Sequence, residues 1–350
     1  MANYIFLKDT LEENIFNLKK AFSDKNITFG IFYSVKTNSS DEVLNVINKH
    51  CKFEIVSDYE WELIEKYSPT EIVLNGPSKN LTILEKIYKS DVQKIYFNID
   101  NDTDLELLRH CYQEFKDKLI VGIRVYCNKT GVWNRFGYDI DSERFNQILS
   151  EFKYIEGFHF HFSTNNFDIT NYDLMLDKIN HIIEKYNLNI KYIDIGGGLP
   201  GANEIIYQNK VFSDLPELLK NKINNKILII SEVGRHLVEN TFNINSSIIS
   251  IKRQSDDKYD VTIDTNILHF PCFWEKKFSI DYQPLIKQKG KPATVNIFGN
   301  SCMQIDKIVS DYPLPHTPEV GDKIIINNVG AYSLSQASNF ITPIPSIIIN

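Results

Sequence analysis

No apolar run in the sequence approaches the roughly 20 residues that a membrane-spanning helix requires. Basic patches are also lacking: the net charge is -7 and the pI is about 5.7, which argues against nucleic acid as a partner. Lys8, Asp9, Glu12 and Glu13 follow the first residue almost at once, so we expect no secretory signal. The expected protein therefore binds neither membranes nor nucleic acid.

Cysteine is scarce, and its arrangement excludes two further classes of protein. The chain has five cysteines, an odd number, and no Cys-x-x-Cys pair. A disulfide framework and a structural zinc site are therefore both disfavoured. The location that fits best is a reducing cytoplasm.

The sequence does contain eight short apolar, β-branched runs before residue 240, separated by stretches with helical periodicity. Such an alternation predicts a parallel sheet covered by helices. Eight units in about 220 residues favour a closed (β/α)8 barrel over a doubly wound sheet. The eight runs are 29–35, 53–57, 71–76, 94–99, 119–125, 155–163, 190–196 and 227–234.

The pattern changes near residue 240, where strand-like runs follow one another without a long helix. We expect an antiparallel β domain built from 244–252, 260–267, 293–298 and 323–327, to which residues 1–7 add a strand. The predicted domains are a barrel over residues 8–240 and a β domain over residues 241–350.

Lys36 follows the first barrel run directly. Barrel enzymes place their active sites at the carboxyl ends of the strands, and a desolvated lysine there can form a Schiff base. Polar or charged residues mark the other strand ends in the same way: Glu54, Ser57, Arg124, His159, His161, Asp194 and Glu232.

Three consecutive glycines, 196–198, follow the seventh run. Their backbone N–H groups can approach a phosphate closely, and barrels favour phosphate sites in the loops after strands seven and eight. Arg235 would add a charge-assisted contact. The sequence therefore predicts a phosphate site at this end of the barrel.

His159 and His161 point to the same face of one strand. No carboxylate or cysteine stands at ligand spacing from these histidines, so no metal site is predicted. We expect instead that the His161 ring stacks on a flat cofactor. Glu232 would keep a pyridine nitrogen protonated, so that the ring accepts the electrons released when a bond to Cα breaks.

Nine motifs occur in a fixed order along almost the whole chain: 33–38, 53–57, 75–79, 135–137, 158–161, 194–198, 232–235, 299–302 and 330–332. This ordered set resembles the pyridoxal-phosphate-dependent group IV decarboxylases of the alanine-racemase-like fold. That family includes the ornithine, arginine, diaminopimelate and carboxynorspermidine decarboxylases.

The resemblance implies a role for each matching residue. Lys36 resembles the Schiff-base lysine, His161 the histidine stacked on the cofactor ring, and Glu232 the partner of the pyridine nitrogen. Cys302 resembles the cysteine that reaches the site from a second subunit of a homodimer with shared active sites and takes part in protonating the product. The implied pyridoxal 5'-phosphate site comprises Lys36, Glu54, Ser57, Arg124, His161, Thr164, Gly196, Gly197, Gly198, Glu232, Gly234, Arg235 and Tyr332.

Departures from the family pattern concern mainly the substrate end. Met303 stands where relatives acting on basic amino acids have an acidic residue, and Glu54 replaces a more usual aspartate. Either the substrate has a neutral, acidic or substituted far end, or Asp306 or an acid from elsewhere takes over the acidic role. The expected substrate contacts are Met303, Asp306 and His269.

The resulting hypothesis is a cytoplasmic decarboxylase that releases CO2 from a small amino acid in a biosynthetic or specialised pathway. An amino-acid racemase of the same fold is one alternative, although it would normally use an arginine at the ring nitrogen and a tyrosine from the β domain. A non-catalytic, pyridoxal-phosphate-binding regulatory homologue is the other.

Overall fold

The protein is described by a computed structural model that covers residues 1–127, 134–162, 168–271, 278–285 and 291–350. Its contacts divide the chain into two compact units, residues 12–237 and residues 1–11 with 238–350. Among the described residues, no helix has the length and apolarity needed to cross a membrane.

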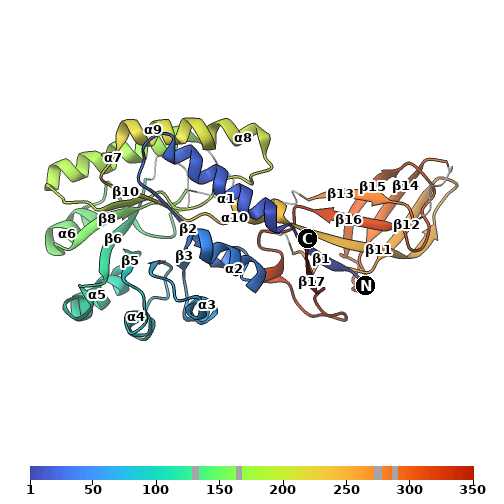
Figure 1. The fold of residues 1–350 in the computed structure, drawn as a ribbon, viewed down its shortest axis with the longest axis horizontal. Coiled ribbons are helices and arrows are strands. Elements are labelled where there is room, and N and C mark those ends of the chain that lie inside the picture. The colour runs from blue at the N-terminus through green and yellow to red at the C-terminus, as the bar shows by residue number, and fades with distance from the viewer. Residues whose placement is uncertain (128–133, 163–167, 272–277, 286–290) are drawn as a thin grey trace. The chain divides into compact units, whose positions relative to one another are not determined.

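The first unit is a closed barrel of eight parallel strands, as the alternating pattern predicts (Figure 1). Each strand pairs with its neighbours in the barrel, and the last pairs with the first, so the sheet has no open edge. A two-residue strand, β7 (Tyr138–Asp139), adds to β6 alone. The barrel strands are β2 (Phe29–Ser34), β3 (Lys52–Ile55), β4 (Glu71–Leu74), β5 (Lys94–Ile99), β6 (Leu119–Tyr126), β8 (Ile155–His159), β9 (Tyr192–Asp194) and β10 (Leu228–Ser231).

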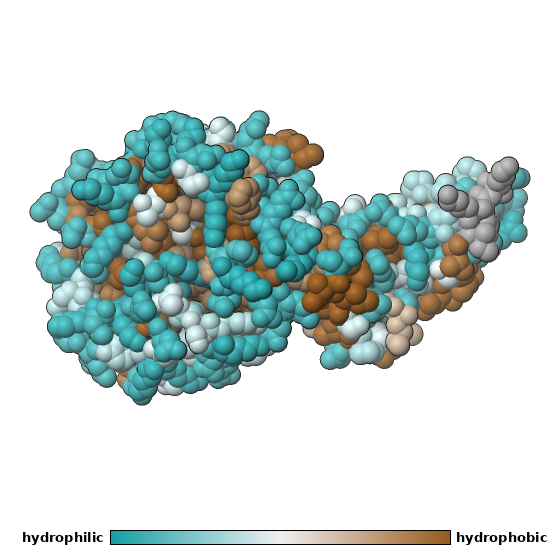
Figure 2. Space-filling model, viewed as in Figure 1, coloured by the Kyte–Doolittle hydropathy of each residue, from teal (hydrophilic) through white to brown (hydrophobic). Residues whose placement is uncertain are grey.

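Helices follow the strands and present a mostly hydrophilic outer surface (Figure 2). Several begin at a polar residue whose side chain accepts a hydrogen bond from a backbone N–H of the first turn, as Asn80, Asn101 and Ser142 do. The helices are α1 (Lys8–Ser23), α2 (Asp41–His50), α3 (Asp58–Ile64), α4 (Leu81–Tyr88), α5 (Asp102–Phe115), α6 (Glu143–Glu151), α7 (Ile169–Tyr186), α8 (Ile205–Asn209), α9 (Leu215–Lys222) and α10 (Arg235–Val238).

Aromatic side chains fill the barrel interior below the carboxyl ends of the strands. Tyr96 packs edge-on against Phe32 and Tyr192, with ring centroids 5.5 and 5.0 Å apart. Gly157 makes room for Tyr192, because a Cβ atom at that position would collide with the ring. This packed layer fills the barrel interior, so we expect the active site at the carboxyl-terminal ends of the strands.

The second unit is an eight-stranded sheet of mostly antiparallel pairs, with parallel pairing only between β12 and β14 and between β1 and β17 among the described strands. β1 (Asn3–Phe6) pairs with β11, so the start of the chain contributes to this sheet. The strands are β1, β11 (Phe242–Arg253), β12 (Lys258–Ile263), β13 (Ser279–Gln283), β14 (Ala293–Phe298), β15 (Lys307–Leu314), β16 (Lys323–Asn327) and β17 (Ile347–Ile349).

Candidate active site

Polar side chains from successive barrel strands meet at the carboxyl ends of those strands. We call this cluster the polar ring, and every member is buried. Parallel strands of a barrel all end at the same rim, so one polar residue per strand suffices to build it. The polar ring consists of Ser34, Glu54, Asn75, Asn98, His159, Asp194 and Glu232.

Lys36 lies in a short 3₁₀ turn, residues Val35–Thr37, directly after β2. Its Nζ lies 2.7 and 3.0 Å from the two carboxylate oxygens of Glu54. Ser34 donates a further hydrogen bond of 2.6 Å to Glu54. The lysine side chain is 43% exposed and its partner 1% exposed, so a buried carboxylate holds an accessible amine.

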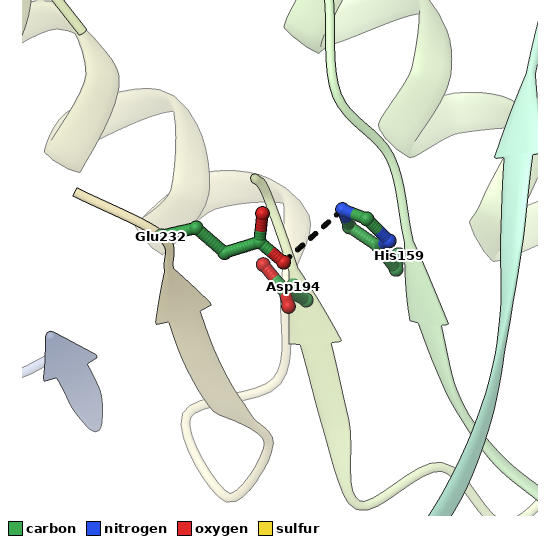
Figure 3. A group of neighbouring side chains, drawn as sticks. All are labelled: His159, Asp194 and Glu232. Atoms are coloured by element: carbon green, nitrogen blue, oxygen red, sulfur yellow. Dashed lines mark ion pairs between the residues drawn. The ribbon is translucent and has the colours of Figure 1, made fainter. Parts of the chain in front are cut away.

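Glu232 follows β10, and Figure 3 shows it facing His159 and Asp194 of the polar ring. Asn75 donates a hydrogen bond to its Oε1, and Nε2 of His159 lies 3.3 Å from the same atom. Burial and the nearby charge of Glu54 raise the pKa of Glu232 to about 7. Its carboxyl group can therefore gain or lose a proton near neutral pH.

Asp194 and Glu232 bring two carboxyl groups to His159, with one potential ligand atom of each residue within 4.8 Å of the others. The sequence did not reveal this grouping, because the three residues lie on different strands. Asn75 and Asn98 donate hydrogen bonds to these carboxyl groups, and such bonds occupy oxygen atoms that a metal ion would need. The absence of a metal stays a prediction.

The glycine loop after β9 packs tightly against the strand ends. Gly196 has a φ of +67° and donates its N–H to Asp194, while Gly197 donates to Nδ1 of His161 at 3.1 Å. A Cβ atom on Gly197 would lie 2.5 Å from the carbonyl oxygen of Glu232. The N–H groups of Gly196 and Gly197 thus donate to neighbouring side chains in this structure, and the phosphate contacts expected of the glycine loop stay a prediction.

His161 is half-buried, and its Nδ1 accepts the N–H of Gly197. Burial and the positive charges of Arg124 and Lys36 lower the pKa of His161 to about 3. The ring is therefore neutral over the physiological range. A neutral, flat ring suits the stacking role that the resemblance implies.

Arg124 and Lys79 form a second charged group beside the barrel mouth. The Arg124 guanidinium lies 4.9 Å from the Phe136 ring centroid, and its NH1 lies 3.5 Å from Asp100. Lys79 is fully buried, with its Nζ 2.8 Å from Asp104. Burial lowers the pKa of Lys79 and raises that of Asp104. We did not single out Lys79 from the sequence, although it ends the motif 75–79.

Replacing Lys79 with methionine is expected to lower the free energy of unfolding by about 3–5 kcal/mol, because the carboxylate of Asp104 would remain buried without its partner. Urea unfolding of the cofactor-free protein measures this loss. Lys86→Met is the matched control, since Lys86 makes a half-exposed ion pair with Glu62 at 3.3 Å and should change stability by at most about 1 kcal/mol. Equal losses in the two variants would contradict the prediction.

Ser57, expected in the cofactor site, caps α3. Its hydroxyl accepts the N–H of Glu60 at 3.2 Å, and the Glu60 carboxylate in turn accepts the N–H of Val56 at 2.6 Å. Burial and the charge of Glu54 raise the pKa of Glu60 to about 7. The hydroxyl hydrogen of Ser57 stays available to a ligand, so the cofactor role of Ser57 stays a prediction.

Replacing Glu60 with glutamine is expected to stabilise the protein at alkaline pH. Because the pKa of Glu60 is higher in the folded chain than its ordinary 4.5, the folded state binds more protons between these values. The contribution of Glu60 to the free energy of unfolding therefore falls as pH rises through this window. At about pH 8 the variant should gain about 1–3 kcal/mol. Urea unfolding at about pH 5 and pH 8 tests this, and an equal effect at both values would contradict it.

The remaining predicted site residues of the described chain lie in the second unit. Cys302 is exposed and has a left-handed backbone with φ of +59°, and Tyr332 shares this conformation with φ of +61°. Met303 is half-buried. Thr164, which was also expected at the cofactor, lies outside the described residues.

Asp306 and His269 are buried within the second unit, and their contact with a substrate stays a prediction. The carboxylate of Asp306 accepts backbone N–H groups of Ile267 and Ser301 at 3.0 and 2.9 Å. His269 lies 2.9 Å from the hydroxyl of Thr265 through Nδ1. Each is 1% exposed, so the described side-chain contacts of both residues lie inside the unit.

Known proteins resemble this chain in sequence. The sequence model of the family described as "Pyridoxal-dependent decarboxylase, pyridoxal binding domain" matches residues 8–239. The chain is 28% identical to diaminopimelate decarboxylase of Campylobacter jejuni, over 97% of this chain and 88% of that protein. It is 24% identical to antizyme inhibitor 2 of Xenopus laevis, over 88% of this chain and 73% of that protein.

A solved structure extends the likeness in fold to the whole chain. A variant of Helicobacter pylori diaminopimelate decarboxylase in complex with L-lysine has a TM-score of 0.83 at 22% identity, covering 100% of this chain and 91% of that one. At this level of identity the likeness concerns the fold alone.

Proposed function

This chain belongs to the pyridoxal-dependent decarboxylases, and from that premise we propose that it removes the α-carboxylate of an amino acid with Lys36 as the anchor of the cofactor. The observation that carries the proposal is the position of Lys36, paired with Glu54 at 2.7 Å, at the same rim of the barrel as Glu232. Both groups follow the carboxyl end of a barrel strand, where such folds perform their chemistry.

The residues at the rim fit pyridoxal phosphate, the cofactor of the family. The primary amine of Lys36 suits the aldehyde, the buried carboxyl of Glu232 suits the pyridine nitrogen, and Arg235 beside Gly234 suits the phosphate. When bound, the cofactor supplies an electron sink for the pair released from Cα.

The chain's own side chains then have separate tasks. Glu54 accepts the proton that Lys36 must lose before its amine can react, since the two groups are already hydrogen-bonded. Glu232 keeps a proton on the pyridine nitrogen, and His161 offers a neutral ring. The exposed thiol of Cys302 donates a proton to the product.

We also propose that the protein is a homodimer in which Cys302 completes the active site of the partner subunit. We propose a cytoplasmic location. Three cysteines of the described chain are free thiols: Cys51, Cys111 and Cys302. This agrees with a reducing compartment. Sedimentation analysis tests the assembly, and a monomer with full turnover would contradict the shared site.

For the substrate we propose diaminopimelate or another amino acid whose far end is not a lone ammonium group. The name of the Campylobacter jejuni relative supports diaminopimelate. Met303, directly after Cys302, cannot accept a hydrogen bond from an ammonium group as a carboxylate would. The far end of the substrate therefore needs other partners.

Release of CO2 from a panel of amino acids tests the function and the substrate together. Purified protein with pyridoxal phosphate is incubated with diaminopimelate, lysine, ornithine, glutamate and N-substituted diamino acids. Activity on ornithine or lysine alone would contradict the proposed substrate class. Chiral inversion without CO2 would indicate the racemase, and cofactor binding without turnover on any compound would favour a regulatory protein, as the antizyme inhibitor relative suggests.

A further inference from the structure

Two carboxyl groups of the polar ring, Asp194 and Glu232, lie next to each other inside the barrel, and Figure 3 shows them side by side. One oxygen atom of each carboxyl group lies within 4.8 Å of the other. Asp194 is 0% exposed and Glu232 is 8% exposed. Two buried anions at such a distance repel strongly, so this pair keeps at least one proton in the folded protein.

A directed chain of hydrogen bonds defines which oxygen atoms accept. Tyr192 donates its hydroxyl to Oδ1 of Asn98 at 2.6 Å, which turns the Asn98 amide nitrogen towards Asn75 and Asp194. Asn75 receives one of these bonds on its oxygen at 3.0 Å. Its own amide nitrogen then donates to Glu232. This series of hydrogen bonds therefore directs amide N–H donors towards both carboxyl groups.

Charges around the pair decide where the proton resides. Lys36 after β2 and Arg124 on β6 favour an anionic Glu232, and Glu54 on β3 disfavours it. For Asp194, burial and the charges of Glu232 and Glu54 raise the pKa well above its ordinary value. His159 on β8 adds no positive charge, because burial lowers its pKa well below its ordinary range. The pKa of Tyr192 on β9 is raised well above its ordinary value, so Tyr192 stays neutral. The proton therefore resides on Asp194.

We propose that Asp194 is a positioning residue for the reaction: its protonated carboxyl group donates a hydrogen bond to Glu232 and holds that carboxylate ready for the pyridine nitrogen. This inference rests on the proposed function of Glu232. Asp194 itself touches neither substrate nor cofactor, since it is fully buried and its Oδ1 accepts the N–H of Gly196 at 2.9 Å.

The protonation of Asp194 can be measured without any cofactor. Carboxyl ¹³C resonances of the cofactor-free protein, labelled in its Asp and Glu side chains, are followed between about pH 5 and pH 8. The resonances are assigned by their loss in Asp194→Asn and Glu232→Gln. Asp194 should keep the chemical shift of a protonated acid while Glu232 titrates. An ionised Asp194 at neutral pH would overturn the proposal, and so would a stoichiometric metal ion that Asp194→Asn removes.

Two variants of the holoenzyme test the positioning role. Asp194→Ala should lower kcat/KM roughly 10- to 100-fold, the value of one lost charge-assisted hydrogen bond, and should raise the apparent pKa of the acidic limb of the pH profile. Asp194→Asn should restore at least about ten-fold over alanine, because an amide can donate to Glu232 as a protonated acid does. Equal losses in the two variants would overturn the proposal.

The proposed role of Glu232 and the proposed protonation of Asp194 can fail independently of each other. If Glu232→Gln left the cofactor absorbance and turnover unchanged, the proposed function of Glu232 would fail. The ¹³C titration of the cofactor-free protein would still decide whether the two carboxyl groups share a proton.

Discussion

Replacing Lys36 with alanine is expected to abolish the absorbance band of lysine-bound pyridoxal phosphate and to lower turnover at least about 10⁴-fold. Lys36 follows β2 directly, and its Nζ contacts both oxygens of the buried Glu54 at 2.7 and 3.0 Å. The Lys36 side chain is 43% exposed and pairs with a buried acid that can accept its proton, whereas the Lys79 side chain near this rim is fully buried. Titration with pyridoxal phosphate, followed by absorbance and CO2 release, measures both effects.

Lys52 supplies the matched control for Lys36. It lies at the opposite, amino-terminal end of the strands, at the start of β3, where it pairs with Glu71 at 2.6 Å. Lys52→Ala should therefore keep the absorbance band and the turnover. Full CO2 release by Lys36→Ala would contradict the assignment of Lys36, whatever the control shows.

The barrel was predictable from the sequence because each of its strands is a short buried apolar run with a helix before the next. The expected run 94–99 coincides with β5, and 119–125 differs from β6 by one residue. Three strands of the second unit were missed. β13 has only five residues, of which Ile280 and Tyr282 are half-buried, while β15 shifts register against β14 and contains Asp311 in a left-handed conformation. Strands this short or irregular give only a weak period-two signal.

The charged part of the candidate site was also predictable, since Lys36 and Glu232 each follow a recognisable strand and Glu54 lies within one. The amides were not: Asn75 and Asn98 are single neutral residues on separate strands, and only the closed barrel brings them together. For Asp306, the sequence did not show that its carboxylate accepts backbone N–H groups of its own unit. Such contacts depend on the fold, and the predicted substrate role of Asp306 stays a prediction.

Replacing Glu232 with glutamine is expected to lower kcat roughly 10²- to 10³-fold, because a neutral amide cannot keep the pyridine nitrogen protonated. The same change should stabilise the cofactor-free protein. The pKa of Glu232 is raised from its ordinary 4.5 to about 7, so its contribution to the free energy of unfolding falls as pH rises between these values. Urea unfolding at about pH 8 should show a gain of at least ~1 kcal/mol.

Glu60→Gln is the control that separates these two effects. Glu60 is buried and its pKa is also raised to about 7, but its carboxylate binds the backbone N–H of Val56 and lies outside the polar ring. Both variants should gain stability at alkaline pH, while only Glu232→Gln should lose turnover. If replacing Glu232 raises the stability and lowers the turnover, then its carboxyl group destabilises the folded protein but is needed for the reaction. If both variants kept full turnover, Glu232 would be an ordinary buried carboxyl group, and the protonated ring nitrogen would need another partner.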